Sequence, residues 1–322
     1  MSEPKTLLEA IQYFSDPENC RSFMVSIRWA DEVVRCPRCG HDKVAYMDKA
    51  KLYFCPKKHE RPKFSLKVGT IFEDSPIALE KWLPAAWLIA NCKNGISSYE
   101  LARVIRVTQK SAWHMLHRLR KAMGEEHTEP MDGAKNPTEA DECFLGGKSK
   151  NMHADKRARA QQNGQHTEKA IVFGLYERNT RKVRAKVIPN VRRDVLQAEI
   201  LNQVAPGSAI FTDAWKGYAG LDEKRFVHET VSHINEYLRG QVHTNSIENF
   251  WSLLKRSLAG SYVAVEPFHL DAYLDEQTFR FNNRIGMKDA DRFKKLLSQI
   301  VGKRLTYTEL TGKDSDGQLP PF

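Results

Sequence analysis

Residues 243–256 read HTNSIENFWSLLKR, and this segment is the most informative one for the fold of the chain. In a helix, Asn245, Glu248, Ser252 and Lys255 share one face, because their spacings of three, four and three residues follow the helical repeat. The opposite side carries the apolar residues Ile247, Phe250 and Leu254. The pattern predicts an amphipathic helix over Ser246–Leu258 whose apolar face packs on a sheet.

The sequence around this helix alternates between apolar runs and helical patterns from Thr138 onward. The runs that predict strands are Glu139–Phe144, Ala170–Tyr176, Lys182–Ile188, Ala209–Thr212 and Arg225–Thr230. Two further helical patterns cover Arg192–Val204 and Pro267–Asn282. Strands interrupted and followed by helices in this order predict an α/β fold, in which the helices pack on the sheet.

Two acidic residues lie where the predicted strands would present them. Asp141 lies within EADECFLGGK (residues 139–148), and Asp213 ends AIFTD (residues 209–213). An aspartate at the end of a buried strand is costly unless it is paired or binds a cation. With Glu248, these residues offer three hard oxygen ligands that suit Mg²⁺ or Mn²⁺, and two such ions support an in-line phosphoryl displacement. Lys255, on the same helical face as Glu248, would then hold a phosphate.

The alternative is that these carboxylates are ordinary surface and strand-end residues. The chain contains 40 Asp and Glu residues, so three of them can fall at suitable positions by chance. Spacing alone therefore does not establish catalysis.

A cysteine-rich segment near the N-terminus has the spacing of a metal site. A Cys-x2-Cys turn followed by glycine precedes a Cys-x3-His pair, and the four candidate ligands are Cys36, Cys39, Cys55 and His59. Two such pairs on facing hairpin turns supply the tetrahedral set that Zn²⁺ prefers, with strands at Val44–Tyr46 and Leu52–Phe54 forming the ribbon. We expect the zinc to be structural, because so small a domain cannot bury enough core. The alternative is a small hairpin with reduced cysteines and no metal.

The next segment predicts two helices joined by a tight turn. Ser97 and Glu100 have the spacing of a capping box, and a second helix is expected over Gln109–Met123 after a turn at Val107-Thr108. A short helix followed by a basic one is typical of a helix-turn-helix, whose second helix enters the major groove of DNA. The basic face of this second helix would comprise Lys110, His114, Arg118, Arg120 and Lys121. An ordinary helical hairpin with a solvated basic side is the alternative.

The composition agrees with a nucleic-acid partner and argues against a membrane or secreted protein. The 322 residues include 50 Lys and Arg against 40 Asp and Glu, a formal net charge of +10. No apolar run of membrane-spanning length occurs, and the N-terminus lacks the apolar core of a signal peptide. The six cysteines are not evenly arranged as in a disulfide framework, which favours a reducing cytoplasm. With a DNA partner, we expect the protein to be nucleoid-associated there.

These patterns divide the chain into six segments. We expect an N-terminal helical segment (1–30), a zinc ribbon (31–72), a helix-turn-helix region (73–124), a linker (125–137), a catalytic domain (138–290), and a C-terminal helix and tail (291–322). A basic stretch containing Lys148, Lys150 and Arg157 falls between the first two strands of the catalytic domain. It is predicted to be a DNA-contacting loop or a merely solvated one.

In its ordered motifs the chain resembles the DDE-type insertion-sequence transposases that carry an N-terminal zinc ribbon. The matching pieces lie at residues 36–39, 69–72, 141–148, 212–218, 243–256 and 273–284. The resemblance implies a ribonuclease-H-like mixed sheet with flanking helices, in which Asp141, Asp213 and Glu248 bind two metal ions. Lys255 matches the lysine seven residues after the glutamate in such transposases, while Asn245 is an alternative third ligand.

The resemblance also implies a reaction and its partners. A transposase of this type binds the terminal repeats of its element, cuts them and joins them to target DNA, so we expect a homo-oligomer on DNA. The residues expected to contact DNA are Lys110, His114, Arg118, Lys121, Lys148, Lys150, Arg157, Lys255 and Arg256. Two alternatives are a DNA-binding regulator and a nuclease of the same fold that does not join strands.

Overall fold

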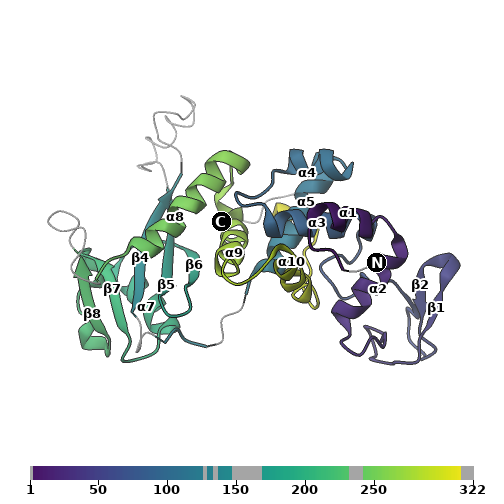
Figure 1. Cartoon of the computed structure of the whole chain (residues 1–322). Helices are drawn as coiled ribbons and strands as arrows, with labels where there is room; N and C mark the ends of the chain where they lie inside the picture. The colour runs from purple at the N-terminus through teal and green to yellow at the C-terminus, as the bar shows by residue number, and fades with distance from the viewer. Residues whose placement is uncertain (1–2, 126–128, 133–136, 147–168, 232–241, 313–322) are drawn as a thin grey trace. The chain divides into compact units, whose positions relative to one another are not determined.

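The computed structural model describes residues 3–125, 129–132, 137–146, 169–231 and 242–312 (Figure 1). The chain folds into two compact units. The first combines Met1–Glu125 with Asn283–Phe322, and the second is Glu126–Asn282. The C-terminal segment therefore belongs to the same unit as the N-terminal segments, which the sequence patterns did not indicate.

The second unit is built on a five-stranded mixed sheet, which confirms the predicted α/β fold. Its strands are β4 (Thr138–Leu145), β5 (Ala170–Glu177), β6 (Lys182–Ile188), β7 (Ala209–Asp213) and β8 (Val227–Val231). They lie in the order β6-β5-β4-β7-β8. The pairs β6-β5 and β5-β4 are antiparallel, whereas β4-β7 and β7-β8 are parallel. Every predicted strand has bounds within two residues of those observed.

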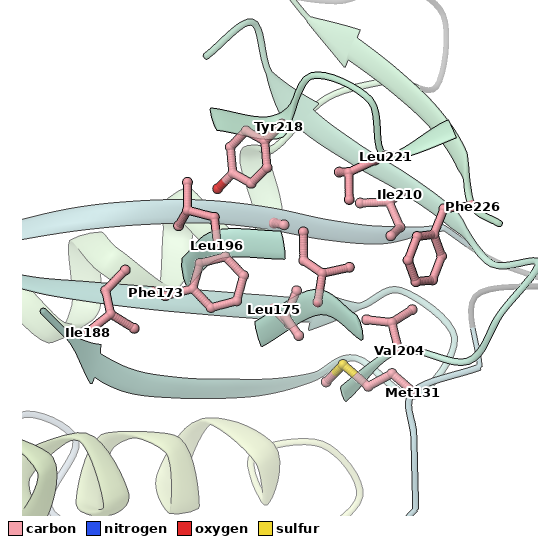
Figure 2. Packing of buried hydrophobic residues seen from close by; sticks show 12 residues of the cluster. Met131, Phe173, Leu175, Ile188, Leu196, Val204, Ile210, Tyr218, Leu221 and Phe226 are labelled. Atoms are coloured by element: carbon pink, nitrogen blue, oxygen red, sulfur yellow. The ribbon is translucent and has the colours of Figure 1, made fainter. Parts of the chain in front are cut away.

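Helices cover both faces of this sheet. Alternate residues of each strand point to opposite sides, and apolar side chains on both sides need to be buried. On one face, Phe173 and Leu175 of β5 pack with Leu196 of α7 (Arg193–Gln203), as Figure 2 shows. On the other face, Val172 and Tyr176 pack against α8 (Asn245–Ser257) and α9 (Leu270–Asn282). Short helical turns complete the unit at Lys216–Tyr218, Asp222–Lys224, Leu258–Tyr262 and Pro267–His269.

The first unit contains a small three-stranded antiparallel ribbon. Its strands are β1 (Ala45–Met47), β2 (Leu52–Phe54) and β3 (Lys63–Phe64), with a 3-10 turn at Asp48–Ala50. The first strand begins one residue later than predicted, and the two-residue third strand was not predicted. Gly40 directly follows the Cys-x2-Cys turn and has φ +71°. This left-handed conformation favours glycine, which explains the glycine at this position.

Helices form the rest of the first unit. They are α1 (Leu7–Tyr13), α2 (Pro17–Arg28), α3 (Leu79–Asn91), α4 (Ser98–Ile105), α5 (Gln109–Met123), α10 (Asp289–Ser298) and α11 (Tyr307–Thr311). Phe293 of α10 packs against the rings of Phe14, Phe23 and Trp87, and all four side chains are buried. The returning chain thus completes the core of this unit. None of the described helices combines the length and apolar character that a bilayer crossing requires.

Candidate active site and metal centre

The ribbon brings the four predicted zinc ligands together. One ligand atom from each of Cys36, Cys39, Cys55 and His59 lies within 4.8 Å of all the others. Cys36 Sγ is 3.6 Å from His59 Nε2, and Cys39 Sγ is 3.6 Å from Cys55 Sγ. These separations are close to the edge of a tetrahedron built with Zn–S bonds of about 2.3 Å, and too long for a disulfide. The quartet therefore fits a zinc ion.

Backbone turns hold the quartet in place. The Cys36 N–H donates to the His41 carbonyl (2.8 Å), and the Cys55 N–H donates to the Pro62 carbonyl (2.9 Å), so each pair sits on a closed turn. Burial opposes ionisation of Cys36, but hydrogen bonds from the backbone of Arg38 and Cys39 outweigh it and lower the pKa of the thiol. A thiolate is the form that binds metal.

In the second unit, Asp141 and Asp213 lie near each other on adjacent parallel strands, close enough for the charge of Asp213 to act on Asp141. The register pairs Thr138 with Ile210 and Glu139 with Phe211, and each aspartate follows two residues after the second of these pairs. Asp141 also pairs with Gly174 on its other side. The parity of the strands directs both aspartates to the sheet face that α8 covers.

Glu248 joins these aspartates from the first turns of α8. Its charge, like that of Asp213, acts on Asp141, so the three carboxylates are electrostatic neighbours. Its side chain is exposed, and its Oε1 accepts a hydrogen bond from the Thr244 hydroxyl (2.9 Å). Asn245 is likewise exposed, one turn earlier on the same helix. Among the described residues, only the zinc quartet is as tight as 4.8 Å, so the carboxylates form a more open group.

The electrostatics of this group favour a bound cation. Burial, together with the smaller effect of the charges of Asp213 and Glu248, raises the pKa of Asp141 to about 7, against hydrogen bonds that lower it. The neighbouring Glu142 also has a pKa of about 7, chiefly because of burial. A divalent ion would relieve the repulsion among ionised carboxylates, and oxygen donors of this kind are the ligands that Mg²⁺ and Mn²⁺ prefer.

A buried carboxylate that sequence reasoning missed anchors the start of α8. Glu139 is fully buried, and its Oε2 accepts the backbone N–H groups of Ser246 (2.9 Å) and Ile247 (3.0 Å). Its Oε1 accepts from Arg178 Nε (2.6 Å), and Arg178 also donates to the His243 carbonyl (2.8 Å). Glu139 thus ties β4, which carries Asp141, to the helix that carries Glu248. The one signal in the sequence that could have identified Glu139 is its position two residues before Asp141 on the same strand.

Lys255 and Arg256 lie exposed in the last turn of α8. Lys255 borders a cavity of about 630 Å³ whose lining includes Phe144, Gly146 and Leu258. The ammonium group is close enough to Cys143 to interact with its thiol, which places Lys255 over β4, two residues beyond Asp141. Lys255 is therefore available to an anion that approaches the carboxylates.

The predicted capping box of α4 is confirmed. The Ser97 hydroxyl accepts the Glu100 N–H (3.2 Å), and the Glu100 carboxylate accepts the Ser97 N–H (3.0 Å). Arg106, at φ +52°, then begins the turn into α5.

The predicted basic face of α5 is wrong for two of its five residues. Arg118 is buried and donates to the carbonyls of Leu305 (3.0 Å) and Glu73 (2.8 Å), and Arg120 is buried as well. His114 is half-buried against the ring of Tyr307. The C-terminal segment and the loop before α3 cover this side of the helix, which the sequence of α5 alone does not reveal.

Two of the predicted DNA-contacting residues of α5 remain exposed. These are Lys110, whose Nζ lies 4.7 Å from the centre of the Tyr307 ring, and Lys121. Lys148, Lys150 and Arg157 lie outside the residues that the structure describes.

Comparison with known proteins matches both units. Residues 133–282 match the ISXO2-like transposase domain, and residues 15–57 match the transposase zinc-ribbon domain. The second match ends before His59, so the fourth ligand rests on its spacing to Cys55 and on the structure rather than on the family match. With this match, the Cys/His quartet supports a structural zinc.

Two relatives illustrate the similarity along the chain. An uncharacterized protein in transposable element ISH50 of Halobacterium salinarum is 28% identical over 263 residues, covering 77% of this chain and 85% of the relative. An uncharacterized transposase-like protein of Haemophilus influenzae is 34% identical over 102 residues, covering 32% of this chain and 82% of the relative.

Proposed function

The chain belongs to the DDE-type insertion-sequence transposases with an N-terminal zinc ribbon, and on this premise we propose that it cuts the ends of its own element and joins them to target DNA. Asp141, Asp213 and Glu248 are the proposed ligands of the catalytic metal ions. The observation that carries the proposal is the placement of two aspartates side by side on parallel strands, beneath a helix that brings a third carboxylate.

The strand order supports a ribonuclease-H-like assignment. Such a fold has three antiparallel strands followed by two parallel ones, and the sheet here has the order β6-β5-β4-β7-β8 with that pattern of directions. In this assignment Asp141 belongs to the first strand and Asp213 ends the fourth.

Each group has a distinct proposed task. Divalent ions, Mg²⁺ or Mn²⁺, would supply activation of the attacking oxygen and stabilisation of the leaving oxygen. The three carboxylates hold and orient them, with Glu248 rather than Asn245 as the third ligand because only the glutamate carries charge. Lys255 and Arg256 bind the backbone phosphates that flank the cut. No covalent bond between protein and DNA is needed.

The first unit is proposed to recognise the element ends. Helices α4 and α5 would act as a helix-turn-helix, with Lys110 and Lys121 as the exposed cations of α5. Neutralising phosphates with lysine and arginine makes binding fall steeply with salt. Two ends must be held at once, so we propose a homo-oligomer on DNA, to be tested by the mass of the protein–DNA complex in solution.

The test uses labelled DNA of the element ends, a target plasmid, and Mg²⁺ or Mn²⁺. Wild type should give cut and joined products, whereas Asp141→Asn should give neither while binding the ends normally. Asp194→Asn, an exposed residue of α7 on the other face of the sheet, makes the same charge change and should remain active. Cutting without joining would indicate a nuclease instead, and specific binding without chemistry would indicate a DNA-binding regulator.

A further inference from the structure

Trp251 touches the active-site carboxylate directly. It lies on α8 with 4% of its surface exposed, and its indole Nε1 donates a hydrogen bond of 3.0 Å to Asp141 Oδ2. The rest of the ring packs in the apolar layer between α8 and the sheet, together with Phe250 and Leu254. These two neighbours fill the layer without a polar group, so packing alone does not require an indole at position 251.

A glycine on the neighbouring strand makes this contact possible. Gly174 pairs with Asp141 across β4 and β5. A Cβ atom at residue 174 would lie 2.6 Å from both Cη2 and Cζ2 of Trp251, and 3.0 Å from Ile247 Cδ1. These separations are far below van der Waals contact, and a buried ring held by a helix cannot move aside cheaply. A glycine inside a central strand usually marks such a close approach, because it otherwise weakens the strand.

We propose that Trp251 and Gly174 form a positioning pair for Asp141. The indole N–H holds Oδ2 and fixes the rotamer of the carboxylate, which leaves Oδ1 directed to the metal site. Gly174 provides the space in which the ring reaches the carboxylate. Residues that hold a metal ligand by hydrogen bonds set its orientation and its affinity for the ion. This inference rests on the proposed function, in which Asp141 binds a divalent ion.

The test measures Mn²⁺ binding to the full-length, zinc-loaded protein by the EPR signal of free Mn²⁺, without DNA. Trp251→Phe keeps a large ring and removes only the N–H donor, so Mn²⁺ binding should weaken about 10-fold or more. Gly174→Ala keeps the N–H but displaces the ring, and should weaken binding similarly. If both act through one hydrogen bond, adding Gly174→Ala to Trp251→Phe should cause little further loss.

Two controls separate this effect from loss of structure. Trp82 is also a buried indole whose Nε1 donates to a side-chain oxygen, Ser75 Oγ at 3.2 Å, but it lies in the first unit. Trp82→Phe should leave Mn²⁺ affinity unchanged. Thermal unfolding of each variant identifies any that does not fold, and if Trp251→Phe fails in this way, Gly174→Ala decides the question.

The outcomes distinguish the two proposals. If Asp141→Asn binds Mn²⁺ as tightly as wild type does, the metal role of Asp141 in the proposed function is wrong. If Asp141→Asn abolishes binding but folded Trp251→Phe and Gly174→Ala bind as wild type does, the positioning pair is wrong and the proposed function stands. If both variants weaken binding and Trp82→Phe does not, the pair is supported.

Discussion

The zinc quartet and the carboxylate group, which we propose as a second cation site, are built by the chain in opposite ways. The four zinc ligands lie between residues 36 and 59, on turns closed by their own backbone, and their ligand atoms meet within 4.8 Å. The carboxylates Asp141, Asp213 and Glu248 come from two strands and a helix, and they form a looser group. Two residues that are not proposed ligands contact this group: Glu139 accepts hydrogen bonds from the start of α8, and Trp251 donates one to Asp141.

This difference follows from the chemistry of the ligands. Thiols can approach one another while protonated, so short turns can assemble them before metal arrives. Ionised carboxylates repel each other, so a stable fold must hold them near without closing the group, and it uses surrounding hydrogen bonds to do so. A substitution of a zinc ligand should therefore disturb the ribbon alone. The carboxylate group, in contrast, should also be disturbed by substitutions of the residues that surround it.

The largest effect is expected from Cys36→Ser. Losing one thiolate should reduce zinc content from about one equivalent to nearly none, because apparent binding energies of about 10–16 kcal/mol for structural zinc depend on the full ligand set. The ribbon strands should then lose order while the second unit melts as before. Zinc analysis and calorimetry measure this. Cys92→Ser, at a half-buried cysteine outside the quartet, should keep its zinc. Full zinc occupancy in Cys36→Ser would contradict a four-ligand site.

A smaller but non-local effect is expected from Glu139→Gln. This change removes the buried negative charge beside Arg178 and replaces one of the two acceptor oxygens, which serve Arg178 and the start of α8, with an NH₂ group. Breaking such a pair costs about 3–5 kcal/mol in the free energy of unfolding, measurable by urea titration of the second unit. Glu199→Gln breaks the partly exposed pair with Lys186 and should cost under about 1 kcal/mol. Equal losses in the two variants would argue against Glu139 as an anchor.

The carboxylate group should also make stability depend on pH when no magnesium or manganese is added. The pKa of Asp141 is about 7 in the folded protein, against 3.8 as its ordinary value. The folded state therefore keeps a proton that the unfolded state releases, and this contribution to stability is lost as pH rises from about 4 to about 7. Asp141→Asn should gain stability relative to wild type as pH rises from about 5 to 8.

Urea midpoints at several pH values test this difference, to which Glu142 also contributes because the Asp141 charge raises its pKa. A gap between Asp141→Asn and wild type that stays constant over this range would contradict a raised pKa. Added Mn²⁺ should stabilise wild type at pH 8 and have little effect on the variant, because only the ionised carboxylate binds the ion.

The smallest effect on stability is expected from Lys255→Gln. Lys255 is exposed, so the free energy of unfolding should change by no more than about 0.5 kcal/mol. If Lys255 contacts a phosphate, DNA cleavage should fall, and the salt slope of DNA binding should decrease by about one. Lys224→Gln, another exposed lysine of the second unit, should change neither quantity. Unchanged cleavage and salt slope in Lys255→Gln would remove this residue from the proposed DNA contacts.

Local sequence patterns were sufficient for most elements of the second unit. Strand bounds such as Lys182–Ile188 were predicted without error, because apolar runs and turn residues mark them clearly. Asp141 and Asp213 were singled out because an aspartate in or at the end of an apolar strand is unusual, and their role as metal ligands stays a prediction. His59 came from its spacing to Cys55, although the quartet itself is a property of the folded ribbon.

The errors and omissions come from contacts between distant segments. Arg118 looks like a surface residue on its own helix, but the backbone carbonyls of Leu305 and Glu73 bind it and it is buried. Glu139 and Gly174 look like an ordinary strand start and an ordinary strand glycine until α8 is placed over them. Periodicity reports which face of an element is apolar, but not which remote residue will cover it.

The return of the chain after Asn282 has a consequence for synthesis on the ribosome. The core around Phe293, which joins Phe14, Phe23 and Trp87, cannot close until α10 has been translated, although the proposed DNA-reading helices emerge much earlier. The second unit, in contrast, is a continuous segment that can fold while the remaining chain is still being made. The first unit, which is proposed to bind DNA, is therefore the last to fold completely. A truncated mRNA that ends after codon 282 would yield a folded second unit attached to an incomplete first unit.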